Sequence, residues 1–287
     1  MRIDLHTHTM ASDGLLEAPA LIAEAAAHGV RLLAVTDHDT TGSVEAALRA
    51  GEDAGIEVWP AVELSCDVDA GEVHVLGYFV DYRLGWFQAL LGRLREGRLH
   101  RAERMVERLT ELGAPVEFAR VEALAAGGAI GRPHVARALV EAGRVRDVTE
   151  AFERYIGRNG PAYVERLKVT PADAVAIIRA AGGLAVLAHP GWAQRDGLIP
   201  DLVSSGLDGI EVYYPDHSPA LVEHYADLAA RYGLLMTGGT DFHGGMLATR
   251  VAVGSQYVPE EIVPPIRSAA ATRRPSPEAP DVPLRAE

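Results

Sequence analysis

Short apolar runs alternate with amphipathic helical stretches over the first 84 residues. The stretches 17–28 and 43–54 carry apolar residues at helical spacing. Compact apolar runs between and around them predict strands at residues 3–5, 32–36, 58–62 and 73–80. This alternation predicts an α/β fold built on a parallel sheet or barrel.

The pattern changes twice further along the chain. Strand signals vanish over residues 85–168, where helical periodicity predicts a helical insertion. From residue 170 the alternation returns, with strands expected at 184–188, 209–213 and 234–237. We therefore divide the chain into a first barrel part (1–84), the insertion (85–168) and a second barrel part (169–258). Residues 259–287 are rich in Pro and Ala and are expected to form a mobile tail.

Composition and charge narrow the class of protein. The chain has 287 residues, of which 48% are hydrophobic, and a formal net charge of −13. This charge disfavours non-specific binding to duplex DNA or to an anionic membrane. With a single cysteine, Cys66, and no apolar segment long enough for a signal peptide or a membrane span, we expect a cytoplasmic protein. The sequence does not indicate an oligomeric state.

The predicted insertion is the cationic part of this acidic chain. Residues 86–168 hold 15 basic and 11 acidic side chains, a balance of +4, which leaves 12 basic and 29 acidic for the remainder. Lys168 is the only lysine. Any charged contact with a phosphate must therefore come mainly from arginine, whose planar guanidinium binds phosphate through two parallel hydrogen bonds.

Histidines and carboxylates gather where the predicted strands end. In an extended chain His6 and His8 point to the same side, so both imidazoles can bind one ion. Six of the 11 histidines lie in or beside strands, mostly at the carboxyl ends, which form the active-site face of a βα barrel. The candidate metal ligands are His6, His8, Asp13, His38, Glu63, His74, His189, Asp241 and His243.

Nine ligands of this kind are more than one ion needs. Tetrahedral zinc takes four ligands and octahedral manganese six, so two or three divalent ions are implied. The lone Cys66 argues against a thiolate site. Clustered divalent ions neutralise phosphate oxygens and lower the pKa of a water, so hydrolysis of a phosphate ester is the leading hypothesis.

The same residues carry a resemblance to a known family. Successive motifs resemble, in order, those of the PHP (polymerase and histidinol phosphatase) superfamily. They are His6-Thr7-His8, Ser12-Asp13-Gly14, Thr36-Asp37-His38, Glu63, His74-Val75-Leu76-Gly77-Tyr78, His189-Pro190 and Asp241-Phe242-His243. The resemblance implies a distorted (β/α)7 TIM-like barrel that holds three metal ions.

The resemblance also implies which residues hold each ion. One ion would be held by His6, His8, Glu63 and Asp241; a second by Glu63, His74 and His189; and the third by Asp13, His38 and His243. Mn²⁺ is our first choice of metal, and Fe²⁺ and Zn²⁺ also suit this mixed ligand set.

The insertion is similar to that of one subgroup of the superfamily. Its segment Gly131-Arg132-Pro133-His134 and the helix with Arg98 and Arg101 resemble the inserted domain of enzymes that hydrolyse nucleoside 3′,5′-bisphosphates and remove 5′ nucleotides from short oligoribonucleotides. This implies that Arg98, Arg101, Arg132 and His134 contact substrate. Arg132 would neutralise charge on the phosphoryl oxygens, and His134 or a water on the metal would protonate the leaving oxygen. Substrates would be such nucleotides or short RNA.

Several alternatives remain open for these residues. The helix arginines could form a solvated face paired with glutamates, and His134 could be a core histidine at a helix start. Asp37 and Asp39 could orient His38, or Asp39 could cap a helix. Trp192, Tyr213 and Tyr214 could line a base pocket or simply pack.

Two other functions fit the same residues. A histidinol-phosphate phosphatase would use this metal site but gives no use for a cationic insertion. A non-catalytic metal-binding module would not need nine ligands.

Overall fold

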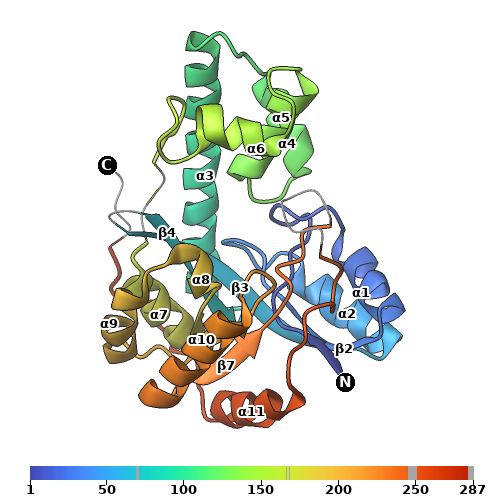
Figure 1. The fold of residues 1–287 in the computed structure, drawn as a ribbon, viewed down its shortest axis with the longest axis vertical. Helices are drawn as coiled ribbons and strands as arrows, with labels where there is room; N and C mark the ends of the chain where they lie inside the picture. The colour runs from blue at the N-terminus through green and yellow to red at the C-terminus, as the bar shows by residue number, and fades with distance from the viewer. Residues whose placement is uncertain (69–70, 166, 168, 245–250, 284–287) are drawn as a thin grey trace.

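The computed structural model describes residues 1–68, 71–165, 167, 169–244 and 251–283. Lys168 lies outside the described residues. In the described part of the chain, seven strands form one sheet in sequence order, and helices surround it (Figure 1). The strands are β1 (Arg2–Asp4), β2 (Val30–Val35), β3 (Glu57–Val68), β4 (Gly71–Tyr78), β5 (Leu184–Leu187), β6 (Gly209–Tyr213) and β7 (Leu235–Gly238).

Helices connect the strands and form the part above the sheet in Figure 1. They are α1 (Ala18–Ala27), α2 (Val44–Ala54), α3 (Gly85–Glu111), α4 (Phe118–Ala125), α5 (Arg132–Glu141), α6 (Val148–Ala151), η1 (Phe152–Ile156), α7 (Pro171–Ala180), α8 (Pro190–Ala193), η2 (Asp196–Leu198), α9 (Ile199–Ser204), α10 (Pro219–Tyr232), η3 (Glu260–Ile262) and α11 (Val263–Ala271). The predicted α/β fold is confirmed. None of the helices in the described ranges has the length and apolar character needed to cross a membrane.

The sheet is mixed, although a parallel one is expected from the sequence. Strands β1, β2 and β3 are parallel, as are β5, β6 and β7, but β4 is antiparallel to both of its neighbours. The reason is the short connection: β4 begins at Gly71, three residues after β3 ends at Val68. A parallel return needs a crossover of about a dozen residues or more, so the chain can only turn back on itself.

The two ends of the sheet meet through the segments that follow β1 and β7. The Leu5 N–H donates to the Gly238 carbonyl at 3.1 Å, and the His8 N–H donates to the Phe242 carbonyl at 2.9 Å. Thr7 and Phe242 also form a parallel bridge. The sheet therefore curls until its first and last strands are neighbours, and residues after β1 lie beside residues after β7.

Helix α3 belongs to two hydrophobic cores. Its first turns bury Phe87 and Leu91 in the core that lies against the sheet, and its later turns bury Met105 and Leu109 in a separate core with α4 and α5. Figure 1 shows this helix running from the sheet up to α4–α6. A continuous helix, rather than a flexible linker, thus sets the position of the helical part over the sheet.

The segment after residue 258 differs from the mobile tail expected from its composition. It forms η3 and α11, and buries Ile262, Val263 and Ile266 in the cluster inside the curved sheet. Two of the prolines that suggested a tail, Pro264 and Pro265, lie in the first turn of α11. Prolines are compatible with a helix there because the first N–H groups have no partner within the helix.

Candidate active site

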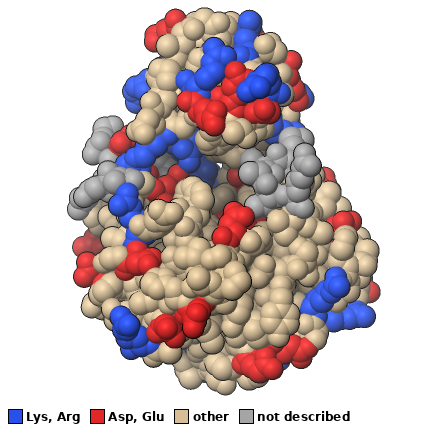
Figure 2. Space-filling view, in the orientation of Figure 1, with Lys and Arg blue, Asp and Glu red and all other residues tan. Residues whose placement is uncertain are grey.

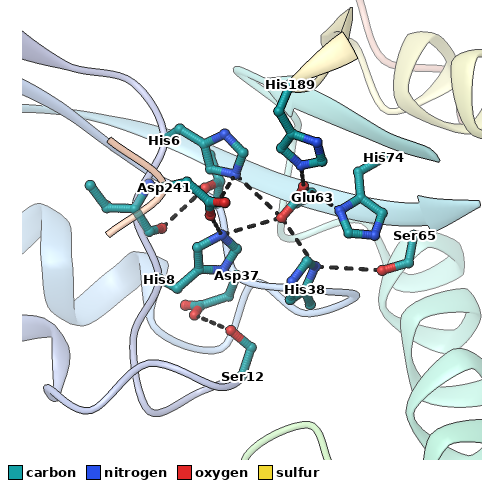
Figure 3. A network of polar contacts seen from close by, with 12 residues as sticks. His6, His8, Ser12, Asp37, His38, Glu63, Ser65, His74, His189 and Asp241 are labelled. Atoms are coloured by element: carbon teal, nitrogen blue, oxygen red, sulfur yellow. Dashed lines mark hydrogen bonds and ion pairs between the residues drawn. The ribbon is translucent and has the colours of Figure 1, made fainter. Parts of the chain in front are cut away.

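The structure brings all nine candidate ligands to one place. His6 and His8 follow β1, His38 follows β2, and Glu63 lies within β3. The rest come from the loop after β1, from β4, and from the segments after β5 and β7. Figure 3 shows His6, His8, His38, His74 and His189 arranged around Glu63. Within the described ranges, three sets have ligand atoms within 4.8 Å of one another: His6, His8, Glu63 and Asp241; His8, Asp13, His38 and His243; and His38, Glu63 and His74.

Glu63 is the centre of this cluster. Its carboxylate is fully buried, and both oxygens face imidazoles. The Oε2 atom lies 3.3 Å from His6 Nε2, 3.2 Å from His8 Nε2 and 3.1 Å from His38 Nδ1, and the Oε1 atom lies 2.8 Å from His74 Nδ1 and 3.1 Å from His189 Nε2. One carboxylate therefore contacts side chains from four different segments, namely the residues after β1, after β2 and after β5, and strand β4.

Several atoms of the cluster are buried without a hydrogen bond. Among the described residues, His6 Nε2, His8 Nε2 and Glu63 Oε2 are buried and have no hydrogen-bond partner. Leaving such a group unpaired costs about 1–3 kcal/mol each. Imidazole nitrogens and carboxylate oxygens are ligands of Mn²⁺, Fe²⁺ and Zn²⁺, so divalent cations fit the cluster and would satisfy these atoms.

The carboxylates of the cluster are held in the ionised form. Burial alone would raise the pKa of Asp13, but the imidazoles of His38 and His243 hold that pKa well below its usual range. Burial would also raise the pKa of Glu63, but the imidazoles of His38 and His74 keep that pKa well below its ordinary value. Metal ligands must be deprotonated, and these carboxylates meet that requirement at neutral pH.

A buried carboxylate that the sequence analysis missed contacts two of the ligands. Both oxygens of Glu211 in β6 lie close to His6 Nδ1, at 3.0 and 3.2 Å, and one accepts the backbone N–H of His189 at 2.8 Å. Its signal in the sequence is weak. It is the single charged residue of the apolar strand Gly209–Tyr213.

Asp37 holds the loop after β1. It accepts hydrogen bonds from the Thr9 N–H and hydroxyl, both at 2.7 Å, and from the Ser12 hydroxyl at 2.7 Å. It also accepts one from the hydroxyl of Ser43. Because Asp13 follows Ser12 directly, these bonds fix the loop that carries this candidate ligand.

Asp4 holds the loop after β7 in place through hydrogen bonds. It accepts hydrogen bonds from the Thr240 N–H at 2.8 Å, the Thr240 hydroxyl at 2.6 Å and the Gly254 N–H at 2.7 Å. Burial raises the pKa of Asp4 to about 6, despite these bonds. Asp241, the next residue after Thr240, is thereby held beside β1.

Arg98 joins α3 to the cluster. Its side chain is buried, and it donates from Nε to Asp39 at 2.6 Å and from Nη2 to the Ser65 hydroxyl at 2.8 Å. Ser65 Oγ in turn lies 3.4 Å from His38 Nδ1. Asp39 does not cap α2, whose N-cap residue is Ser43. Arg98 is thus engaged within the protein, although its side chain also reaches the cavity described next.

A cavity of about 900 Å³ separates the cluster from the helices above it. Figure 2 shows basic side chains at the level where the helical upper part meets the lower part. Among the described residues, five arginines line the cavity on the helical side: Arg98, Arg101, Arg132, Arg137 and Arg146. Members of the cluster line the opposite side: Asp13, His38, His74 and His243. A molecule in this cavity would contact both groups.

Two of the arginines are held by neighbouring groups. Arg132 donates to Glu72 at 2.6 Å, and its guanidinium lies 5.5 Å from the ring centre of Phe152. Arg101 donates to the Val164 carbonyl at 2.7 Å and lies 5.1 Å from the ring centre of Tyr163. These contacts orient the guanidinium planes before any ligand binds.

His134 is predicted to contact substrate, but the structure buries it at the start of α5. It is 2% exposed and does not belong to the lining of the cavity. Its Nδ1 accepts the backbone N–H of Gly131, at 2.9 Å, at the start of α5. Burial lowers the pKa of His134, so the ring is neutral at neutral pH. Of the two interpretations of this residue, the structure favours a buried histidine at a helix start over a proton donor to substrate.

Comparisons with known proteins confirm the resemblance. The profile of the PHP domain family matches residues 4–157. The chain is 38% identical over 245 residues to a phosphoribosyl 1,2-cyclic phosphate 1,2-diphosphodiesterase from Eggerthella lenta. That alignment covers 84% of this chain and 94% of that protein. The chain is 37% identical to a 3′,5′-nucleoside bisphosphate phosphatase from Chromobacterium violaceum, in an alignment that covers 84% of this chain and 87% of that protein. It is 35% identical to the 5′-3′ exoribonuclease Rnm of Escherichia coli, in an alignment that covers 84% of each protein.

A solved structure has the same fold. The crystal structure described as a metal-dependent phosphoesterase from Bifidobacterium adolescentis superposes with a TM-score of 0.86. It is 31% identical and covers 93% of this chain and 96% of its own.

Replacing Arg98 by alanine tests its role as a structural contact. Arg98→Ala removes the guanidinium that donates to the buried carboxylate of Asp39 and to Ser65, so we expect the free energy of unfolding to fall by about 3 kcal/mol. Arg104→Ala, at an exposed position of the same helix, is the control and should change it by less than about 0.5 kcal/mol. Chemical denaturation measures the free energy of unfolding of both variants. A change in Arg98→Ala as small as that in Arg104→Ala would contradict the assignment.

Proposed function

Because the chain belongs to the PHP domain family, we propose that it is a metal-dependent hydrolase of phosphate esters whose substrate carries a second phosphate. A nucleoside 3′,5′-bisphosphate that loses its 3′-phosphate is the substrate we favour. One observation carries this proposal: the cavity has arginines on one wall and the ligand cluster on the other. A second phosphate would lie against the arginines while the ester to be cleaved lies at the cluster.

We infer three divalent ions, with Mn²⁺ as the first choice and Fe²⁺ or Zn²⁺ as alternatives. The ligand sets implied by the family resemblance are His6, His8, Glu63 and Asp241; Glu63, His74 and His189; and Asp13, His38 and His243. Two of the three close groupings in the structure contain one of these sets complete. Bound there, the ions would activate a water and neutralise the phosphoryl oxygens.

Arg132 is the residue we assign to the second phosphate. Its guanidinium is held by Glu72 and by an aromatic ring, and it lines the cavity. Arg101 and Arg137 line the same wall. A guanidinium binds a phosphate through two parallel hydrogen bonds, so this wall would fix the orientation of the substrate and hold its ester at the cluster.

Trp192 favours a nucleotide over a small amine-bearing monoester such as histidinol phosphate. Its indole is 57% exposed and lines the cavity, with its ring centre 5.5 Å from that of His189. An exposed aromatic ring beside the reacting phosphate gives a base a surface on which to stack. Tyr214, by contrast, donates its hydroxyl to Asp241 at 3.1 Å and belongs to the cluster.

Removal of a nucleotide from the 5′ end of short RNA is the second candidate. The volume of the cavity, about 900 Å³, is near the upper end of the ~300–1,000 Å³ common for small-molecule sites. The lining extends outward to Asp147 and Thr149, which lie before and within α6. A cavity of this volume and extent gives room for more than one nucleotide.

A comparison of substrates tests the proposal. With Mn²⁺ we expect phosphate release from adenosine 3′,5′-bisphosphate to exceed that from adenosine 5′-monophosphate or histidinol phosphate by about 10- to 100-fold in kcat/KM, because a charged contact is worth ~1.5–3 kcal/mol. Nucleotide release from a short 5′-phosphorylated RNA is measured in parallel. EDTA should abolish all activity. Preference for histidinol phosphate, or no turnover of any substrate, would contradict the proposal.

Arg132→Ala tests the assignment of the second phosphate. We expect kcat/KM for the bisphosphate to fall about 10- to 100-fold, and that for the monophosphate to change by less than about threefold, because the monophosphate lacks the group that Arg132 binds. Arg120→Ala, an exposed arginine of α4 that pairs with Glu141, is the matched control and should change neither. Equal losses on both substrates would show that Arg132 does not read the second phosphate.

A further inference from the structure

Glu211 is a charged side chain in an otherwise apolar strand. Its neighbours Ile210 and Val212 point to the core that lies against the helices, so Glu211 points to the other side of β6, into the curved sheet. It is fully buried there. A buried carboxylate needs hydrogen-bond donors around it, and two residues of the ligand cluster supply them.

The first contact sets the tautomer of His6. Glu211 Oε1 and Oε2 lie 3.0 and 3.2 Å from His6 Nδ1. A carboxylate oxygen accepts the hydrogen bond, so Nδ1 is the donor and Nε2 is the ring nitrogen that would bind a metal ion. That atom faces the cluster, 3.3 Å from Glu63 Oε2 and 3.4 Å from Asp241 Oδ1. A metal-binding imidazole requires this arrangement.

The second contact holds the backbone of His189. This residue has φ 25° and ψ 57°, a left-handed conformation that side-chain-bearing residues rarely adopt. Its N–H donates to Glu211 Oε2 at 2.8 Å. The conformation turns the chain from β5 into α8 and places His189 Nε2 3.1 Å from Glu63 Oε1.

We propose that Glu211 is a positioning residue for metal binding that aligns ligands of two neighbouring ions at once. It acts through His6 after β1 and through His189 after β5, which contact opposite oxygens of Glu63. The proposal rests on the metal-binding part of the proposed function and does not depend on the identity of the substrate.

Glu211→Gln tests this with a readout other than activity. The amide keeps the size of the side chain but removes its negative charge, and one of the two oxygens that face His6 Nδ1 becomes an NH₂, which cannot accept a hydrogen bond. We expect Mn²⁺ affinity, measured on the metal-free full chain by competition with a chelating dye, to fall about 10- to 100-fold. Wild-type affinity in this variant would overturn the proposal.

Asp208→Asn is the matched structural control. Asp208 directly precedes β6, is largely buried, and accepts the Ala185 N–H of β5 and a bond from Arg179, each at 3.0 Å. This variant should lower Tm while leaving Mn²⁺ affinity unchanged. An equal loss of affinity in Asp208→Asn would overturn the proposal, because the effect would then follow from a weakened sheet.

Two further outcomes are distinguishable. If Glu211→Gln does not fold, Glu211→Asp replaces it, since it keeps the charge but withdraws the carboxylate by one methylene: lower Mn²⁺ affinity supports the proposal and wild-type affinity overturns it. If the wild-type chain binds no Mn²⁺, the proposed function fails as well. Mn²⁺ binding by the wild type that weakens in Glu211→Gln, with no turnover of any phosphate ester, would support the role of Glu211 and overturn only the proposed function.

Discussion

The buried carboxylate of Glu63 is the group around which the rest of the site is arranged. Five imidazoles contact its two oxygens, and they come from segments spread between residues 6 and 189. Such a cluster is costly to bury, and divalent cations would satisfy the nitrogen and oxygen atoms that have no hydrogen-bond partner among the described residues. The curled sheet is what makes the contacts possible, since it brings the chain after β1 beside the chain after β7. The curvature of the sheet therefore assembles the candidate metal site.

The helical part over the sheet is fixed with respect to that cluster. Helix α3 contributes to both cores, and Arg98 on α3 bonds to Asp39 and Ser65, next to His38. A second contact joins the Ala129 N–H to the Ala11 carbonyl at 2.8 Å. The distance between the arginines and the cluster is thus set by the folded structure, which suits a substrate with two phosphates at a fixed separation.

The sequence predicts well which side chains come together in the cluster, because their signal is local. The spacing of His6 and His8 and the position of ligands at strand ends follow from strand geometry alone. Glu211 and Glu72 are not predicted, because their roles depend on contacts with residues far away in the sequence. The direction of β4 follows from the short connection before it. The pattern of apolar residues does not show that direction. The prolines of α11 indicate a tail by composition, yet the helix is held by apolar residues at helical spacing.

Anomalous diffraction from crystals of the Mn²⁺-loaded protein tests the central claim most directly, namely that this cluster is a metal centre facing the arginine-lined cavity. The account predicts three manganese peaks: one among His6, His8, Glu63 and Asp241; one beside Glu63, His74 and His189; and one beside Asp13, His38 and His243. Manganese peaks that lie elsewhere, or none within the cluster, would contradict it.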